Sequence, residues 1–235
     1  MNTTSSTGGS TVSTALDRAT RAGLHTNRRG RRISVAGAVY IASWVTGLVL
    51  APATPAATAS AQTIHEYYAG EGTSILVQST LIHGVAGLAL AVLALSIPAA
   101  TSASAGLSRL IKAAGVMAAG VSLLQVAFAA VAVATASSAS VAASARLFDD
   151  LNTADTGKLV LIAVFAGCAT LAAARAGIVG RNTRALTAAL VVTLPIGGAA
   201  FVVDNPVLMT VLYVSLPLLL VWAGALTWQI GRHAH

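Results

Sequence analysis

The sequence predicts an all-α protein, a polytopic integral membrane protein built as one six-transmembrane-helix bundle. Its 235 residues are 56% hydrophobic and only 9% charged, whereas about a quarter of the residues in a soluble globular domain are charged. The mean hydropathy is +0.79. Six apolar segments each approach the roughly 20 residues that cross a bilayer as a helix. Basic residues cluster in the short connections between these segments, as membrane topology requires.

Residues 1–32 precede the first apolar segment and are rich in Ser, Thr, Gly and Arg, ending in NRRGRR. This composition holds too little apolar material to offset the entropy of ordering. We therefore expect a disordered basic cytoplasmic tail ahead of a transmembrane domain over residues 33–232. Its arginines are interpreted as a topogenic charge block. As an alternative, they bind anionic lipid headgroups, each contributing about 1 kcal/mol near the surface.

Six transmembrane helices are expected over residues 33–53, 75–98, 110–135, 159–180, 185–203 and 207–230. These segments must be helices, because each unpaired backbone polar group costs several kcal/mol in hydrocarbon. Many glycines and alanines occur in the spans, and such small residues let helix backbones approach closely in lipid. Pro195 and Pro217 lie within the last two spans, where we expect kinks.

The charged residues predict the orientation of the bundle. Most of the 14 Lys and Arg residues lie in segments that share one side, namely Arg18, Arg21, Arg28, Arg29, Arg31, Arg32, Arg109, Lys112, Arg175, Arg181, Arg184 and Arg232. The acidic residues Glu66, Glu71, Asp149, Asp150, Asp155 and Asp204 share the other side. By the positive-inside rule, both the N-terminus and the C-terminus are expected in the cytoplasm.

An alternative interpretation treats the first apolar segment as a cleaved signal peptide, because the small residues Ala59 and Ala61 resemble a cleavage site. Cleavage would leave Gln62 at the mature N-terminus and five spans in the protein. The long apolar run, with Tyr40 and Trp44 inside it, favours a retained first span.

Two longer loops are expected on the outer side, over residues 54–74 and 137–158. In the first, Ser60 can cap a short interfacial helix that the next two glycines end, with its tyrosines at the level of the headgroups. In the second, the apolar residues of Leu147–Leu151 predict a short amphipathic helix. Thr153 is then expected to cap the fourth span.

The stretch from Gln62 to Gly84, QTIHEYYAGEGTSILVQSTLIHG, concentrates polar side chains beside an apolar helix of membrane length. A functional site is expected there first, because polar groups in and near the bilayer are commonly functional. The candidate ligand-binding residues are His65, Glu66, Tyr67, Tyr68, Gln78, His83 and, in the third span, Gln125. Hydrogen bonding between helices is the favoured role for those inside the membrane. His83 is the strongest candidate for a ligand or proton path, because histidine titrates near neutral pH.

A weaker candidate is a metal site formed by His65, Glu66, Asp149 and Asp150, since imidazole and carboxylate groups bind zinc and other divalent ions. The His65–Glu66 pair lacks the second histidine of an HExxH motif, because position 69 is alanine. Solvated loop charges are therefore the favoured interpretation. Cys168, the one cysteine in the chain, lies in an apolar run and is expected in the core. We assign no cofactor, metal or catalytic residue.

Three stretches carry a resemblance to a known group: IHEYYAGEGTSILVQSTLIHG before the second span, LFDDLNTADTGKLVLIAVFAG at the fourth and PLLLVWAGALTWQIGR in the last. Through them, residues 33–232 resemble uncharacterised actinobacterial six-span membrane proteins, near the DUF4386-like domain of unknown function. The resemblance implies a multi-pass protein of the bacterial cytoplasmic (inner) membrane and supplies no catalytic residue. The arginine-rich leader is not part of it. The Ala-rich, Lys-poor composition fits a GC-rich bacterial source.

Three classes of function remain open. The favoured class is a non-enzymatic membrane protein that binds a small or lipidic ligand, or a partner subunit, near its outer loops. A transporter or channel component comes second. The small number of ionisable groups expected in mid-membrane counts against ion or proton coupling. A membrane metalloenzyme using the outer His and carboxylate residues comes third. The expected partners are the lipid bilayer, such a ligand, and a partner subunit or a second copy. Nucleic acid is not expected, because the net charge of +7 is distributed over membrane loops.

Overall fold

The computed structural model describes residues 9–51, 53–203 and 205–233 of the chain, with side chains from Arg28 onward. Within these ranges every regular element is helical, which confirms the all-α class. Residues 1–8 of the predicted tail and Asp204, one of the predicted outer acids, lie outside the described residues.

The elements, in chain order, are α1 (Gly9–Val49), α2 (Ala61–Gly70), α3 (Gly72–Ser79), η1 (Thr80–Val85), α4 (Ala86–Ala100), α5 (Ala105–Thr135), α6 (Val141–Arg175), α7 (Arg181–Gly198), η2 (Ala199–Phe201) and α8 (Pro206–His233). Six segments of the described chain are long and apolar enough to cross a membrane: Arg28–Val49, Gly72–Ala100, Ala105–Thr135, Val141–Arg175, Arg181–Phe201 and Pro206–His233. The prediction of six spans is confirmed, and the chain is a multi-pass membrane protein.

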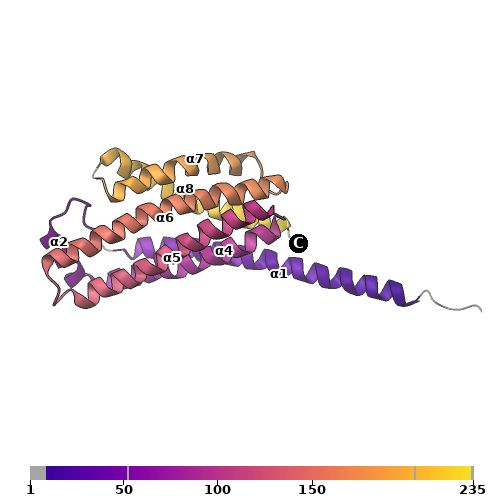
Figure 1. The fold of residues 1–235 in the computed structure, drawn as a ribbon, viewed down its shortest axis with the longest axis horizontal. Helices are drawn as coiled ribbons and strands as arrows, with labels where there is room; N and C mark the ends of the chain where they lie inside the picture. The colour runs from indigo at the N-terminus through magenta and orange to yellow at the C-terminus, as the bar shows by residue number, and fades with distance from the viewer. Residues whose placement is uncertain (1–8, 52, 204, 234–235) are drawn as a thin grey trace, which may run out of the picture.

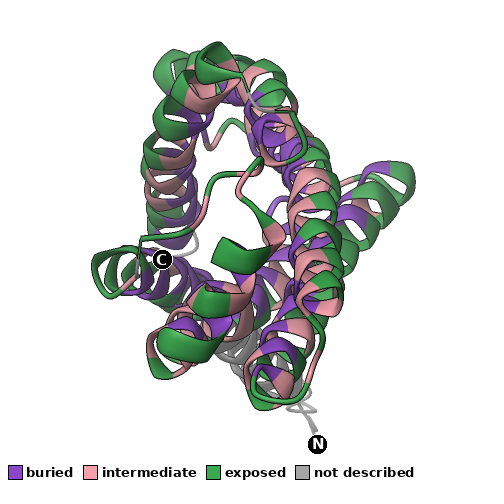
Figure 2. Cartoon of the chain, turned by 90° about the vertical axis from the view of Figure 1, so that its left-hand side faces the viewer, coloured by how far each residue is buried: buried purple, intermediate pink, exposed green. Residues whose placement is uncertain are grey.

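The spanning helices form a ring in which each helix packs beside the next one in the sequence (Figure 1). The first span, α1, closes the ring by packing against α8 as well as α4. Figure 2 views the ring from one end and shows exposed positions over its outer surface. Large apolar side chains are among them, for example Leu88 at 57% and Trp228 at 58% exposed. Exposed apolar side chains of this kind are stable when lipid chains surround the bundle.

The alternating direction of the spans separates the charges along the bundle. The connections α4–α5 and α6–α7 and the C-terminal end of α8 share one end, where Arg109, Arg175 and Arg232 lie. The opposite end holds α2 and the start of α6, with Glu66 and Asp149. The predicted separation of basic from acidic residues therefore exists in the structure. Which end faces the cytoplasm stays a prediction.

The first span differs from the prediction at its N-terminal side. Helix α1 begins at Gly9, whereas the sequence predicted disorder over residues 1–32. Residues 9–32 contain no proline, and a helix that is already formed can extend without the cost of a new nucleus. Tyr40 and Trp44 are buried at 3% and 8% exposure, so the span packs into the bundle.

The fourth span differs more, and the difference matters for the site. The sequence predicted a loop over residues 137–158, with a short helix near Leu147–Leu151 and Thr153 as the cap of the fourth span. Leu147–Leu151 is helical as predicted, but it belongs to the fourth span itself, so the predicted break and the cap at Thr153 are wrong. Helix α6 begins at Val141, where the Ser140 hydroxyl oxygen accepts a hydrogen bond from the Ala143 backbone N–H at 3.2 Å. The segment that follows contains no proline to interrupt it. Helix α6 therefore runs without a break to Arg175.

The short helix predicted in the loop over residues 54–74 is present, with the predicted cap and end. The Ser60 hydroxyl oxygen accepts a hydrogen bond from the Thr63 backbone N–H at 3.1 Å, and α2 ends at Gly70. Helix α2 packs on α6 through Ile64, Tyr68 and Phe148, which belong to a second apolar cluster at this end of the bundle. This cluster ties the outer helices to the spans beneath them.

Small residues set how closely the spans approach, as expected for helices in lipid. A Cβ atom at Gly115 would lie 2.4 Å from the Ala94 Cβ, so only glycine fits between α5 and α4. At Gly197 an added Cβ would lie 2.8 Å from the Cα of Leu212, which is backbone and cannot turn aside. The contact between α7 and α8 therefore depends on glycine.

We predict that Gly197→Ala lowers the free energy of unfolding by about 1–3 kcal/mol, because α7 and α8 must move apart. The matched control is Gly120→Ala, since nothing lies within 4 Å of an added Cβ there. The control should be neutral or stabilised by about 0.5 kcal/mol, because alanine favours helix. The midpoint of thermal unfolding in mild detergent measures both. Equal midpoints for the two variants would contradict the close approach of α7 and α8.

Candidate functional site

A buried lysine defines the candidate site. Lys158 lies on α6, inside a membrane-spanning segment, and is 2% exposed. An ammonium group at such a position is costly unless it is paired and hydrogen-bonded. Its surroundings therefore have to supply both a counter-charge and acceptors.

Three side chains supply them. The Lys158 Nζ lies 2.5 Å from Asp155 Oδ1, donates to Gln125 Oε1 at 2.8 Å and lies 3.0 Å from His83 Nδ1. An ammonium group has three hydrogens to donate, so these contacts use all of them. We call His83, Gln125, Asp155 and Lys158 the Lys158 cluster.

Three neighbouring helical segments position the cluster. Asp155 and Lys158 are three residues apart on α6 and so share one face of that helix. Gln125 comes from α5 and is fixed a second time, because its Nε2 donates to the Leu151 backbone carbonyl at 3.3 Å. Both helices pack closely against each other.

His83 comes from η1, a π-helical turn in the second span. The Ala86 N–H donates to the carbonyl of Leu81, five residues earlier, instead of four as in an α-helix. Such turns interrupt α-helices most often at functional sites. The π turn also packs against α1 and α5, so the widened turn is held between neighbouring spans.

The hydrogen bonds assign the proton on His83. A lysine ammonium only donates, so His83 Nδ1 must be the acceptor of the bond from Lys158. The neutral imidazole then carries its hydrogen on Nε2. A histidine protonated on both nitrogens would lose this bond. The cluster thus holds one positive charge and one negative charge, on Lys158 and Asp155.

The cluster is closed on one side and partly open on the other. Lys158 and Gln125 are 2% and 0% exposed, whereas the side chain of Asp155 retains 19% exposure. His83 is half-buried. Asp155 and His83 are therefore the members of the cluster that keep exposed surface.

The cluster lies toward the acidic end of the bundle. Lys158 precedes Arg175 by 17 residues on α6, or about 25 Å at about 1.5 Å per residue. The hydrocarbon core of a bilayer is about 30 Å thick. With Arg175 at one surface, the cluster lies near the other boundary of the hydrocarbon, below α2 and the start of α6.

The outer candidate residues lie in separate contacts. His65 Nδ1 lies 3.0 Å from the Ser144 hydroxyl oxygen, and the Glu66 carboxylate accepts a hydrogen bond from Gln62 at 2.7 Å. The first contact joins α2 to α6, and the second lies within α2. Gln78 is half-buried on α3. None of these three residues belongs to the Lys158 cluster.

The two tyrosines of α2 pack with each other, their ring centroids 5.5 Å apart. Burial raises the pKa of Tyr68, and the neighbouring Tyr67 adds to this effect. Burial also raises the pKa of Tyr67, against the opposing effect of a hydrogen bond to Thr54. Both phenols are therefore kept neutral, which suits a packing role between α2 and the bundle.

The candidate metal ligands do not converge. Within the residues that the structure describes, no group of three or more His, Cys, Asp or Glu side chains could hold a metal ion. Asp149 and Asp150 are exposed on α6, and His65 is engaged with Ser144.

Sequence analysis found half of the Lys158 cluster. His83 and Gln125 were candidates, and the structure brings them to one site. Asp155 and Lys158 were missed because a loop was predicted over residues 137–158, which made them outer charges. Their spacing of three residues within a segment without proline was the available signal, since it puts both on one face of a helix.

The fold and the site define a class: a multi-pass helical membrane protein with a buried cluster of charged and polar side chains. Comparison with protein-family models, curated proteins and solved structures finds no match for this chain. The resemblance to the DUF4386-like group therefore stays a prediction.

We predict that Lys158→Met lowers the free energy of unfolding by about 3 kcal/mol, because it leaves Asp155 in the bundle without its counter-charge. Lys112→Met is the matched control, since Lys112 is exposed on α5 and surface changes stay within about 0.5 kcal/mol. The double variant Asp155→Asn/Lys158→Met should recover part of the loss. Thermal and denaturant unfolding in detergent measure the free energy of unfolding of each variant in this double-mutant cycle. Strictly additive losses would contradict the pairing.

Proposed function

We propose that this protein is a non-enzymatic integral membrane protein that binds a small ligand at the Lys158 cluster, between its helices and below its outer helices α2 and α3. The observation that carries the proposal is a lysine buried in a membrane span and held by three side chains from three segments. Ionisable groups inside a bilayer are rare and are commonly tied to function.

The contacts indicate which chemistry the ligand presents. Lys158 has no hydrogen left to donate, so an anionic group would have to displace one of its three partners. Asp155 and His83 form the exposed edge. The carboxylate offers acceptor oxygens there, and the imidazole offers the N–H of Nε2. A ligand with a hydroxyl, amide or ammonium group fits this edge better than a simple anion.

A transporter or channel component is the second candidate. The sequence argued against it because few ionisable groups were expected in mid-membrane. Asp155 and Lys158 lie inside a spanning helix but near one boundary of the hydrocarbon, so they weaken that objection only in part. The π turn carrying His83 is compatible with it, because such turns are frequently found at functional sites. Against it, Gln125 is 0% exposed, and both the oxygen and the nitrogen of its amide are hydrogen-bonded. No transported molecule can reach Gln125 in this conformation, so transport requires a second one.

The membrane and the orientation are part of the proposal. The separation of basic from acidic residues supports cytoplasmic termini by the positive-inside rule. A bacterial inner membrane is supported by the composition and by the resemblance to actinobacterial six-span proteins. A partner subunit or a second copy stays an alternative occupant near the outer helices. For the metalloenzyme alternative, we find no supporting geometry among the described residues.

The test is to identify the small molecules that leave the purified protein on denaturation, using mass spectrometry. His83→Ala opens the exposed edge and should reduce the co-purifying ligand at least about tenfold, the loss expected from about 1.4 kcal/mol of binding free energy. His83→Gln keeps an acceptor for Lys158 and should lose less. His65→Ala is the matched control, because His65 lies outside the cluster on α2.

Each variant must keep the unfolding midpoint of the natural protein within a few degrees for the comparison to count. If His83→Ala folds normally and its extract matches that of the natural protein in every molecule, the cluster binds no ligand. In that case the proposal of a binding function at the Lys158 cluster is wrong. If the extract of His65→Ala changes instead, the ligand lies under α2.

A further inference from the structure

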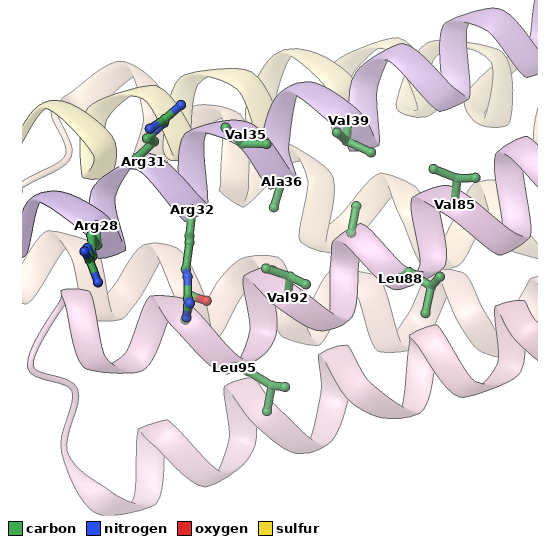
Figure 3. A pocket seen from close by; sticks show the side chains of 12 residues that line it. Arg28, Arg31, Arg32, Val35, Ala36, Val39, Val85, Leu88, Val92 and Leu95 are labelled. Carbon is green, nitrogen blue, oxygen red and sulfur yellow. The ribbon is translucent and has the colours of Figure 1, made fainter. Parts of the chain in front are cut away.

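A groove of about 890 Å³ runs between α1 and α4 on the outer surface of the bundle. Figure 3 shows it from close by, with arginines at one end and apolar side chains along both walls. It is separate from the Lys158 cluster, because none of the four cluster residues lines it.

The regular spacing of residues on α1 builds one wall. Arg28, Arg32, Ala36 and Val39 recur at intervals of three or four residues, so they share one face of the helix. Figure 3 shows Arg28 and Arg32 on the side of α1 that faces α4, and Arg31, which also lines the groove, extending away from α4. Two guanidinium groups are thus presented one helical turn apart at the same end of the groove.

The apolar part of the groove has a small-residue floor and exposed walls. Ala36 and Ala89 are buried at 7% and 6% exposure and form the floor. Above them Leu88, Val92 and Leu95 are 57%, 42% and 56% exposed. Side chains of this kind are stable at the surface of a membrane protein because a lipid chain covers them.

The length of the groove matches one leaflet. Its wall on α4 runs from Val85 to Ser96, which is about 16 Å at about 1.5 Å per residue. The hydrocarbon core is about 30 Å thick, so one leaflet contributes about 15 Å. The groove therefore reaches from the arginines, at the basic end of the bundle, to about the middle of the membrane.

Among the residues whose side chains the structure describes, none supplies a counter-charge to the arginine end of the groove. No acidic residue lines the groove. The contact between Lys158 and Asp155 is the single ion pair in the part of the chain that the structure describes. A guanidinium group matches the oxygens of a phosphate in a two-pronged geometry, and arginine is favoured over lysine for this contact. An anionic phosphate is therefore the complementary group.

We propose that the groove between α1 and α4 binds one anionic phospholipid from the leaflet at the basic end of the bundle. Its phosphate lies between Arg28 and Arg32, and one acyl chain lies over Ala36 and Ala89. The site does not depend on the function of the Lys158 cluster, so either proposal can fail alone.

The experiment measures lipid binding to the full-length purified protein in detergent by native mass spectrometry, with dioleoyl phosphatidylglycerol and dioleoyl phosphatidylcholine as probes. The two lipids share their acyl chains and differ in net charge. The natural protein should retain phosphatidylglycerol at least about tenfold more tightly, since each arginine near the membrane surface contributes on the order of a fivefold change in affinity. Equal retention of the two lipids would overturn the proposal.

The double variant Arg28→Gln/Arg32→Gln should lose this preference. Its matched control is Arg29→Gln/Arg109→Gln, which removes the same charge from the same end of the bundle, at residues that do not line the groove. The control should keep the preference within about twofold. If both variants lose it equally, the lipid is attracted by overall charge and the groove is not its site.

A second pair of variants tests the acyl chain. Ala36→Leu fills the floor of the groove, whereas Ala38→Leu adds the same atoms at an exposed position outside it. Phosphatidylglycerol should bind more weakly to Ala36→Leu alone, with the unfolding midpoint without lipid measured for both. If Ala36→Leu folds and binds as the natural protein does, no chain occupies the groove. If it does not fold, the arginine variants decide the result.

Discussion

The structure is organised around the need to keep one ammonium group charged inside a membrane bundle. Lys158 is buried on α6, and its three hydrogens are directed at groups from α5, α6 and the π turn η1. Removing any one of these segments would leave a polar group without a partner in a medium that offers none. The cluster therefore specifies the relative rotation of three neighbouring segments, which apolar contacts in lipid specify poorly.

Close helix packing is what lets such short side-chain contacts form. Gly115 leaves no room for a side chain against Ala94, and a Cβ at Gly87 would lie 3.0 Å from the Ser122 Cβ. Both contacts join the second span to α5. With these backbones held together, the amide of Gln125 and the imidazole of His83 reach the same ammonium group. The small residues and the Lys158 cluster thus depend on each other. The small residues let the helices approach closely, and the cluster fixes how the helices are aligned with one another.

Sequence analysis predicted the parts of this protein that follow from hydrophobicity and from local hydrogen bonding. Six spans follow from segment length, and Ser60 is a cap because of its hydroxyl group. His83 and Gln125 could be singled out because they are polar residues in apolar runs. Asp155 and Lys158 were missed, because the sequence LFDDLNTADTGK looks like a loop when only its polarity is considered. The Ser140 cap before α6 is a local feature, whereas the docking of α2 on α6 is a tertiary contact that the sequence alone does not show. The π turn also has no sequence signature, since it depends on the helices that surround it.

The ring is closed by a contact between α1 and α8, which are far apart in the sequence. About 157 residues separate Val49 from Pro206, so at roughly 5–20 residues per second α1 waits on the order of 8–30 s for its second neighbour during synthesis. Until then the side of α1 that later touches α8, with glycine at Gly37 against Thr227, must be covered by lipid or by the insertion machinery. Closure of this ring in the cell thus requires a lateral docking of α8 on α1 inside the membrane, and a nascent chain stopped before α8 would leave the ring open.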